Sequence, residues 1–203
     1  MKLYSMAGSC SLTDHIALEW IGKPYEFRLM AREDLKTPEF LALNPLGSVP
    51  CLTDGDFALT QNVAILEYLD DVYPEANLLG SQDIRDKAEA RRWLSFCNAD
   101  LHKMFGPLFV PGRFIADEAV HPALRAQAAE NVKQLLSVAD HALNGKEYLS
   151  GKKSVADAYL FVILRWYLGM EFDLNIFKNL PAFVERMQAD KGVQAAMRKE
   201  GLL

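Results

Sequence analysis

Cys10 is the residue whose type and position point most directly to chemistry. The short apolar run Lys2–Tyr4 predicts a buried strand, and Leu12–Ile21 carries apolar side chains at helical spacing. Cys10 therefore lies where a strand turns into a helix, beside unpaired N–H groups and the positive end of the helix dipole. A thiol there ionises more easily, and the thiolate is the reactive form. Ser9 and Ser11 add hydroxyls and candidate helix caps. A buried thiol that only fills space has the same pattern.

Val49 and Pro50 are a second candidate for ligand contact. The runs Val49–Thr53 and Phe57–Thr60 flank Asp54-Gly55-Asp56, which predicts a hairpin. A proline that opens a strand donates nothing to the sheet, and an X-Pro bond is where a cis peptide costs little. The backbone of Val49 would then be free to pair with a peptide-like ligand. A trans proline that begins an edge strand fits the same pattern.

A predicted helix through Trp93 has two contrasting faces. Plotted at 100° per residue, its apolar face holds Trp93, Leu94, Cys97, Leu101, Met104 and Phe105. The opposite face gathers Ser95, Asn98, Ala99 and His102. A ligand could lie on this small and polar stripe, although an ordinary solvated face has the same composition.

The elements that must position these residues change character near residue 80. The first part predicts the order β-α-β-α-β-β-α, with strands at Lys2–Tyr4, Tyr25–Met30, Val49–Thr53 and Phe57–Thr60 and helices at Leu12–Ile21, Pro38–Leu43 and Val63–Tyr73. After a polar linker at 77–83, only helices are predicted, at Ile84–Phe105, Pro122–Asn144, Val155–Gly169 and Leu180–Lys199. The fold class is therefore α/β followed by all-α, in two domains.

Composition excludes several classes of function. The net charge of −5 argues against nucleic acid as the main partner. The three cysteines are too widely spaced for a metal-ligand pair or a disulfide framework, which favours a reducing, cytoplasmic location. The apolar run Val155–Met170 contains Asp157 and Arg165 and is shorter than the ~20 residues of a membrane span. We expect a core helix, started by a capping box at Ser154 and Asp157.

Together, these motifs resemble the glutathione transferase family over almost the whole chain. They are Gly8-Ser9-Cys10-Ser11, the segment Phe40–Pro50, the segment Leu59–Leu69, Trp93–Phe96 with Leu101-His102-Lys103, Pro107–Phe109, and Ser154–Phe161. The first motif and His102-Lys103 are most similar to the bacterial beta class. The resemblance implies a thioredoxin-like glutathione-binding domain at residues 1–78. It also implies an all-helical domain at 87–203 that supplies the second-substrate pocket, and a homodimer.

The resemblance also implies roles for individual residues. Cys10 and His102 would be catalytic and contact the sulfur of glutathione, with Cys10 able to form a mixed disulfide. The implied glutathione-binding set is Cys10, Lys36, Val49, a cis Pro50, Gln61, Asn62, Ala99, His102 and Lys103. Val49 would pair with the cysteinyl part, and Gln61 and Asn62 would hold the γ-glutamyl carboxylate at a helix N-terminus. The glycine carboxylate would bind Lys36 or Arg32. Candidates for the second-substrate pocket are Phe105, Phe109, Phe114, Trp166 and Tyr167.

The chain departs from the family pattern at several positions. Gln61-Asn62 stands where relatives carry Glu-Ser or Gln-Ser, so carboxylate binding would be altered. Ser5 replaces a frequent tyrosine, and Ser95 and Ala99 replace the polar pair expected on the fourth helix.

The expected function is glutathione transfer to small hydrophobic electrophiles in detoxification, with glutathione as co-substrate and no metal. Glutathione-dependent disulfide reductase or peroxidase activity could use the same cysteine. An alternative is a glutathione-transferase-like protein that binds a regulatory partner and does no chemistry.

Overall fold

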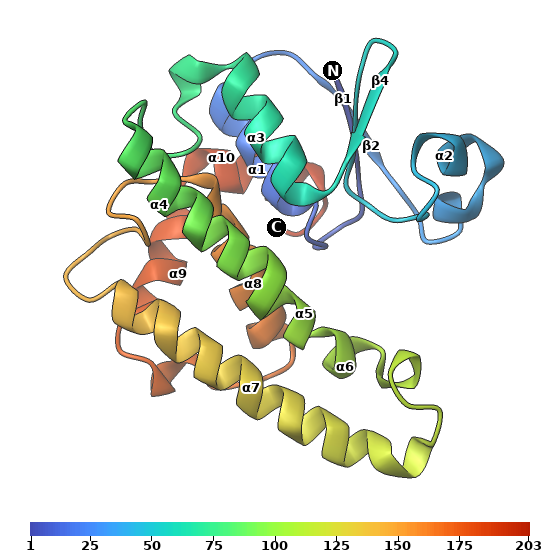
Figure 1. Ribbon diagram of the computed structural model, residues 1–203, viewed down its shortest axis with the longest axis vertical. Coiled ribbons are helices and arrows are strands. Elements are labelled where there is room, and N and C mark those ends of the chain that lie inside the picture. The colour runs from blue at the N-terminus through green and yellow to red at the C-terminus, as the bar shows by residue number, and fades with distance from the viewer.

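Four short strands form one mixed sheet in the first third of the chain, and the computed structural model describes all residues 1–203 (Figure 1). The strands are β1 (Lys2–Ser5), β2 (Glu26–Leu29), β3 (Cys51–Asp54) and β4 (Phe57–Thr60), in the order β2-β1-β3-β4. β1 runs parallel to β2 and antiparallel to β3. A parallel pair needs a crossover connection, and the helix α1 (Leu12–Ile21) provides it.

Alternation along the strands divides their side chains between two faces of the sheet. Leu3 and Leu52 are buried in the large core with α1 and α3 (Asn62–Val72), whereas Cys51 is buried with Phe40 of α2 (Pro38–Leu43). Tyr4 also faces α2, with its ring centroid 5.7 Å from that of Phe40. Helices α1 and α3 thus cover one face and α2 the other, in a thioredoxin-like arrangement (Figure 1).

Beyond α3 the chain is helical, as its composition predicts. The helices are α4 (Ile84–Ser95), a π-helical segment (Phe96–Leu101), α5 (His102–Met104), α6 (Gly106–Phe109), α7 (His121–Ala142), α8 (Val155–Gly169), α9 (Leu180–Ala189) and α10 (Lys191–Lys199). Short 3₁₀ turns lie between several of them. None of these helices is long and apolar enough to cross a membrane.

Helix α8 is the centre of the helical half. Every residue from Val155 to Leu164 is buried, so the predicted core helix is confirmed. Its capping box is also present: the Asp157 carboxylate accepts a hydrogen bond from the Ser154 N–H at 2.9 Å, and a second one from the Leu149 N–H at 2.8 Å. One continuous apolar core joins α8 and the first half, because α1 packs against both α8 and α10.

Two of the predicted helices differ in the structure. The single helix expected over Leu180–Lys199 is broken at Asp190, whose carboxylate accepts hydrogen bonds from the N–H groups of Gly192 and Val193 at 2.9 and 3.0 Å. The same carboxylate accepts the Trp20 indole N–H at 2.8 Å, so a tertiary contact holds the break. The helix expected over Ile84–Phe105 widens into a π-helical turn at Phe96–Leu101.

Candidate active site

Cys10 and His102 line the same cavity, which lies where the sheet half meets the helical half. The cavity has a volume of about 180 Å³ and is lined by Cys10, Asn44, Ser48, Val49, Pro50, Gln61, Asn62, Asn98, His102 and Tyr159. The first seven belong to the thioredoxin-like half and the last three to the helical half. The structure therefore brings together the two residues expected to contact a substrate sulfur.

Cys10 lies in the turn between β1 and α1, and its thiol is held near the cis-proline strand. The Sγ atom is 3.8 Å from the Val49 carbonyl oxygen, to which the thiol donates. The Asn62 side-chain amide donates to the Cys10 carbonyl oxygen at 3.1 Å. Burial, together with the nearby Asp14 carboxylate, raises the pKa of the Cys10 thiol to about 12. The expectation of an easily ionised thiol is therefore wrong, because burial outweighs the backbone N–H groups at the start of α1.

Hydrogen bonds to buried polar side chains hold the turn that carries Cys10 in place. The Ser5 hydroxyl and the Gly8 N–H donate to the Glu200 carboxylate at 2.7 and 3.0 Å. The Ser11 hydroxyl lies 2.7 Å from that of Ser5, and it makes no capping bond to α1, contrary to the expected N-cap role. The Trp166 indole N–H donates to the Gly8 carbonyl at 2.8 Å, so both halves of the chain position this turn.

The segment before β3 lines the cavity with Ser48, Val49 and Pro50. The Val49–Pro50 peptide bond is cis, as the family resemblance implies. The Asn44 side-chain amide donates to the Ser48 carbonyl at 2.7 Å and holds the preceding turn. The sequence does not predict Asn44 or Ser48 as site residues, because Asn and Ser are common in turns and a turn alone explains their presence.

Gln61 joins β4 to α3 in an unusual backbone conformation. Its φ angle is 75°, in the region that residues other than glycine rarely adopt. Such strain is concentrated at ligand-binding positions. It places the first N–H groups of α3, which have no partner within the helix, at the edge of the cavity. Asn62 is only 4% exposed, and its side-chain amide is committed to Cys10, so a ligand would meet the backbone N–H groups here.

His102 reaches the cavity from the end of the π-helical segment. Its Nδ1 atom lies 2.7 Å from the Tyr159 hydroxyl, which in turn donates to Asn98 Oδ1 at 3.1 Å. Burial lowers the pKa of His102, so its imidazole is neutral near pH 7. Asn98 belongs to the polar face of the predicted helix, but no chemical pattern in the sequence indicates a role for Tyr159, which has the spacing of an ordinary core residue.

An aromatic cluster lies directly beside His102. The ring centroid of Trp166 is 4.8 Å from that of His102 and 5.6 Å from those of both Phe105 and Phe109. Phe105 is fully buried beneath the cluster, whereas Phe109 is 48% exposed. These three rings form an apolar wall next to the cavity.

The other two predicted pocket aromatics lie outside this wall. Phe114 is 56% exposed and packs over Gly106. Tyr167 is on the other side of α8, with its ring centroid 5.0 Å from that of Phe172 and its hydroxyl bonded to the Asp173 carbonyl. We therefore leave Tyr167 out of the pocket.

Three further predicted residues do not line the cavity. Ala99 and Lys103 are exposed on the helical half. Lys36 is exposed as well. Its Nζ atom lies beside the turn before Pro50, 3.1 Å from the position that a Cβ atom would take at Gly47. Lys36 thus lies near the cis-proline segment, where it could contact one end of an extended ligand bound along that segment. No group of three or more His, Cys, Asp or Glu side chains is placed to hold a metal ion.

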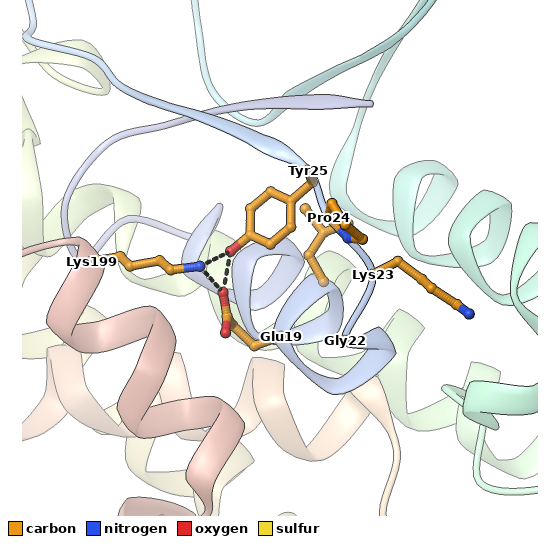
Figure 2. Close-up of a pocket in the computed structure, with 7 residues that line it drawn as sticks. Glu19, Gly22, Lys23, Pro24, Tyr25 and Lys199 are labelled. Carbon is orange, nitrogen blue, oxygen red and sulfur yellow. Dashed lines mark hydrogen bonds and ion pairs between the residues drawn. The ribbon is translucent and has the colours of Figure 1, made fainter.

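A separate cavity of about 360 Å³ lies at the C-terminal end of α1 (Figure 2). In Figure 2 the Tyr25 hydroxyl donates to the Glu19 carboxylate, and Lys199 approaches both groups, with its Nζ atom 3.1 Å from the Tyr25 oxygen. Because these polar groups satisfy one another and none of the expected site residues is present, the cavity beside Cys10 is the better candidate.

Comparison with known proteins shows which family the chain is similar to. The family described as "Glutathione S-transferase, N-terminal domain" matches residues 1–71, and the corresponding C-terminal domain matches residues 94–190. Glutathione S-transferase GST-4.5 of Xanthomonas campestris is 43% identical over 203 residues, which is the full length of both chains.

Solved structures show the same similarity in three dimensions. A glutathione S-transferase from Xylella fastidiosa is 43% identical, with a TM-score of 0.95 over 100% of this chain and 99% of that one. A sphingomonad glutathione S-transferase complexed with glutathione is 36% identical, with a TM-score of 0.88 over the whole of both chains. A bacterial beta class enzyme is among the further matches.

Proposed function

The chain belongs to the glutathione S-transferase family, and on that premise we propose that the cavity between Cys10 and His102 holds the sulfur of glutathione. The protein is a glutathione transferase with glutathione as its co-substrate. The observation that carries the proposed site is that residues from both halves of the chain, Cys10 and His102 among them, line one cavity.

Three parts of the site fit the three parts of glutathione. The backbone of Val49, which lines the cavity, pairs with the cysteinyl residue, as an added strand pairs with a sheet edge. The strained Gln61 and the first N–H groups of α3 receive the γ-glutamyl carboxylate, which suits the positive end of the helix. Lys36 reaches the glycine carboxylate from beyond the Asn44–Pro50 turn. It is better placed than Arg32, for which the structure gives no contact with this turn.

Cys10 and His102 take complementary roles toward the sulfur. With its pKa raised to about 12, Cys10 stays a thiol at neutral pH and donates its S–H to a glutathione thiolate. The neutral imidazole of His102 accepts the proton of the glutathione thiol. The S–H bond breaks, its electron pair stays on sulfur, and the thiolate attacks the electrophilic carbon. The leaving group departs with its own bonding pair, and the imidazolium later releases its proton to solvent.

The second substrate is a small hydrophobic electrophile bound against Trp166 and Phe109, with Phe105 supporting them from beneath. These rings are next to His102, so an electrophile stacked on them meets the sulfur directly.

The two halves of the chain bind different substrates. Residues 1–78 bind glutathione, and residues 87–203 supply the electrophile pocket. Large apolar side chains on β4, α3 and α4 remain exposed, namely Phe57, Val72 and Ile84, which supports a homodimer that covers them. Three free cysteines support a reducing, cytoplasmic location and a role in detoxification.

Disulfide reduction is a secondary use of the site. Cys10 is partly exposed in the cavity, so a glutathione mixed disulfide can reach it. Its raised pKa makes this chemistry slow at neutral pH, since the thiolate is the attacking form.

Retention on immobilised glutathione, followed by conjugation assays with an activated aryl halide, tests the proposed site. We expect the wild-type protein to bind the resin and elute with free glutathione. Failure to bind with the fold intact would favour the alternative of a non-catalytic partner protein.

A further inference from the structure

The Tyr159 hydroxyl is held between two polar groups of the neighbouring helix. It lies 2.7 Å from His102 Nδ1 and donates to Asn98 Oδ1 at 3.1 Å. Tyr159 is fully buried in α8, whose start is fixed by the Ser154 capping box, so this hydroxyl has little freedom to move. Asn98 and His102 come from the π-helical segment and its end, where a widened turn brings both side chains to the same cavity.

The three groups can share their protons in only one direction. A tyrosine hydroxyl carries one proton, and a carbonyl oxygen of an asparagine amide can only accept. Because the Tyr159 proton goes to Asn98, the Tyr159 oxygen must accept from His102, whose Nδ1 therefore carries the imidazole proton. A neutral imidazole has a single N–H, so Nε2 is left with a lone pair. Nε2 makes no hydrogen bond within the protein.

Building on the proposed function, we propose that Asn98 and Tyr159 form a positioning relay. This relay holds His102 in the tautomer with Nδ1 protonated and Nε2 free to accept the thiol proton of glutathione. Neither relay residue touches the reacting sulfur; each acts through His102. The proton leaves the glutathione S–H bond for Nε2, and the resulting imidazolium still donates from Nδ1 to the Tyr159 oxygen. That bond strengthens when the ring becomes charged.

The surroundings of the relay do not provide another proton donor or acceptor for Nδ1. Burial alone lowers the pKa of His102, with no charged neighbour acting on it. Burial is the main cause that raises the pKa of Tyr159. Cys10 and Asp14 from the start of α1 and Cys97 from the π-helical segment raise it further, and only the Asn62 side-chain amide opposes them. Tyr159 therefore stays protonated and can donate to Asn98 throughout the neutral range.

The tautomer is tested directly by ¹⁵N NMR of the histidine rings in the full-length protein without glutathione. In the wild type we expect a protonated nitrogen at Nδ1 and an unprotonated one at Nε2. Asn98→Asp keeps an acceptor oxygen and should keep this tautomer. Asn98→Ala removes the acceptor, so the Tyr159 proton turns to His102 and the tautomer with Nε2 protonated should gain population. Wild-type His102 with Nε2 protonated would overturn the proposal.

Kinetics provide the second readout. Tyr159→Phe should lower kcat/KM by about tenfold, a part of the ~10² to 10⁴ that a positioned base supplies, with the KM for glutathione little changed. The acid limb of the pH–rate profile of this variant should move to lower pH, because the His102 imidazolium loses the Tyr159 oxygen that stabilises it. Tyr148→Phe, whose hydroxyl makes no hydrogen bond, is the matched control. An unchanged tautomer and pH profile in Tyr159→Phe would contradict the relay.

The NMR result does not depend on glutathione binding, so it separates this proposal from the proposed function. A protein that fails to bind glutathione but shows the expected tautomers would refute the function and keep the relay.

Discussion

At the scale of single residues, the site depends on two side chains that favour different protonation states. Burial keeps Cys10 a thiol and keeps His102 neutral, and in the proposed mechanism the first donates to the bound sulfur and the second accepts from it. The sequence pattern around Cys10 predicts its position correctly. It cannot predict the raised pKa, because burial and the approach of Asp14 depend on the folded chain.

His102→Ala should reduce kcat/KM for conjugation by about 100-fold, the lower end of what a positioned general base supplies. The exposed His141 of α7 gives the control, since His141→Ala removes an imidazole far from the cavity and should leave the rate unchanged. Initial rates with an aryl halide measure both variants. Equal rates in the two variants would remove His102 from the mechanism.

Cys10 should react slowly with iodoacetamide at pH 8, more slowly than an ordinary cysteine with a pKa of about 8.5. The rate should rise with pH well beyond that value, because the thiolate forms only as the pH approaches the pKa of about 12. Mass spectrometry of the peptide that contains Cys10 follows the reaction, with the unfolded protein as reference. Rapid alkylation at pH 7 would show that the thiol is already ionised.

At the scale of elements, local signals predict most boundaries, and tertiary contacts explain the exceptions. The capping box at Ser154 and Asp157 is visible in the sequence and starts α8 where expected. The continuous apolar pattern over Leu180–Lys199 hides the break at Asp190. Its carboxylate caps α10 and also accepts the Trp20 indole N–H, a contact that no local pattern indicates. The sequence pattern does not reveal the π-helical turn before His102 either, since the apolar face of the helix continues before and after it.

Asp157 makes the stability of the fold depend on pH. Burial raises the pKa of this carboxyl to about 6, above its ordinary 3.8, so the folded state binds its proton more tightly than the unfolded state. This contribution is complete below pH 4 and is lost as the pH rises through 6, by about 3 kcal/mol in all. Urea unfolding of the wild type and Asp157→Asn between pH 4 and 7 measures it. We expect the variant to lack this decline; equal slopes would refute the assignment.

At the scale of the whole molecule, the C-terminal end of the chain packs against the turn that carries Cys10. Glu200 follows α10 and accepts hydrogen bonds from Gly8 and Ser5, and its carboxylate also lies 3.0 Å from His15 Nδ1. The family resemblance of the motifs predicts the two domains, but it does not predict the hydrogen bonds between Glu200 and the turn that carries Cys10. Ser5 and Glu200 are 195 positions apart in the sequence, and neither has a local pattern that points to the other.

Glu200→Ala should destabilise the protein by about 1–3 kcal/mol, because it removes the carboxylate that accepts from the buried Ser5 hydroxyl and from the partly buried Gly8 N–H. It should also lower conjugation activity, since the turn that carries Cys10 loses its support. Glu185→Ala, at an exposed position on α9, is a suitable control. Denaturant unfolding combined with rate measurements at a temperature where both variants are folded tests the link. Full activity in a destabilised Glu200→Ala would show that the connection serves stability alone.

The central claim is that Cys10 and His102 together stabilise the thiolate of bound glutathione. The ultraviolet absorbance of that thiolate, measured as the enzyme–glutathione complex is titrated with base, tests it most directly. Cys10 itself ionises only near pH 12 and does not interfere in the neutral range. We expect the pKa of the bound thiol to lie at least about one unit below the ordinary value of ~8.5, and to return toward that value in His102→Ala. A bound thiol that titrates like free glutathione, or whose pKa is the same in His102→Ala, would contradict the claim.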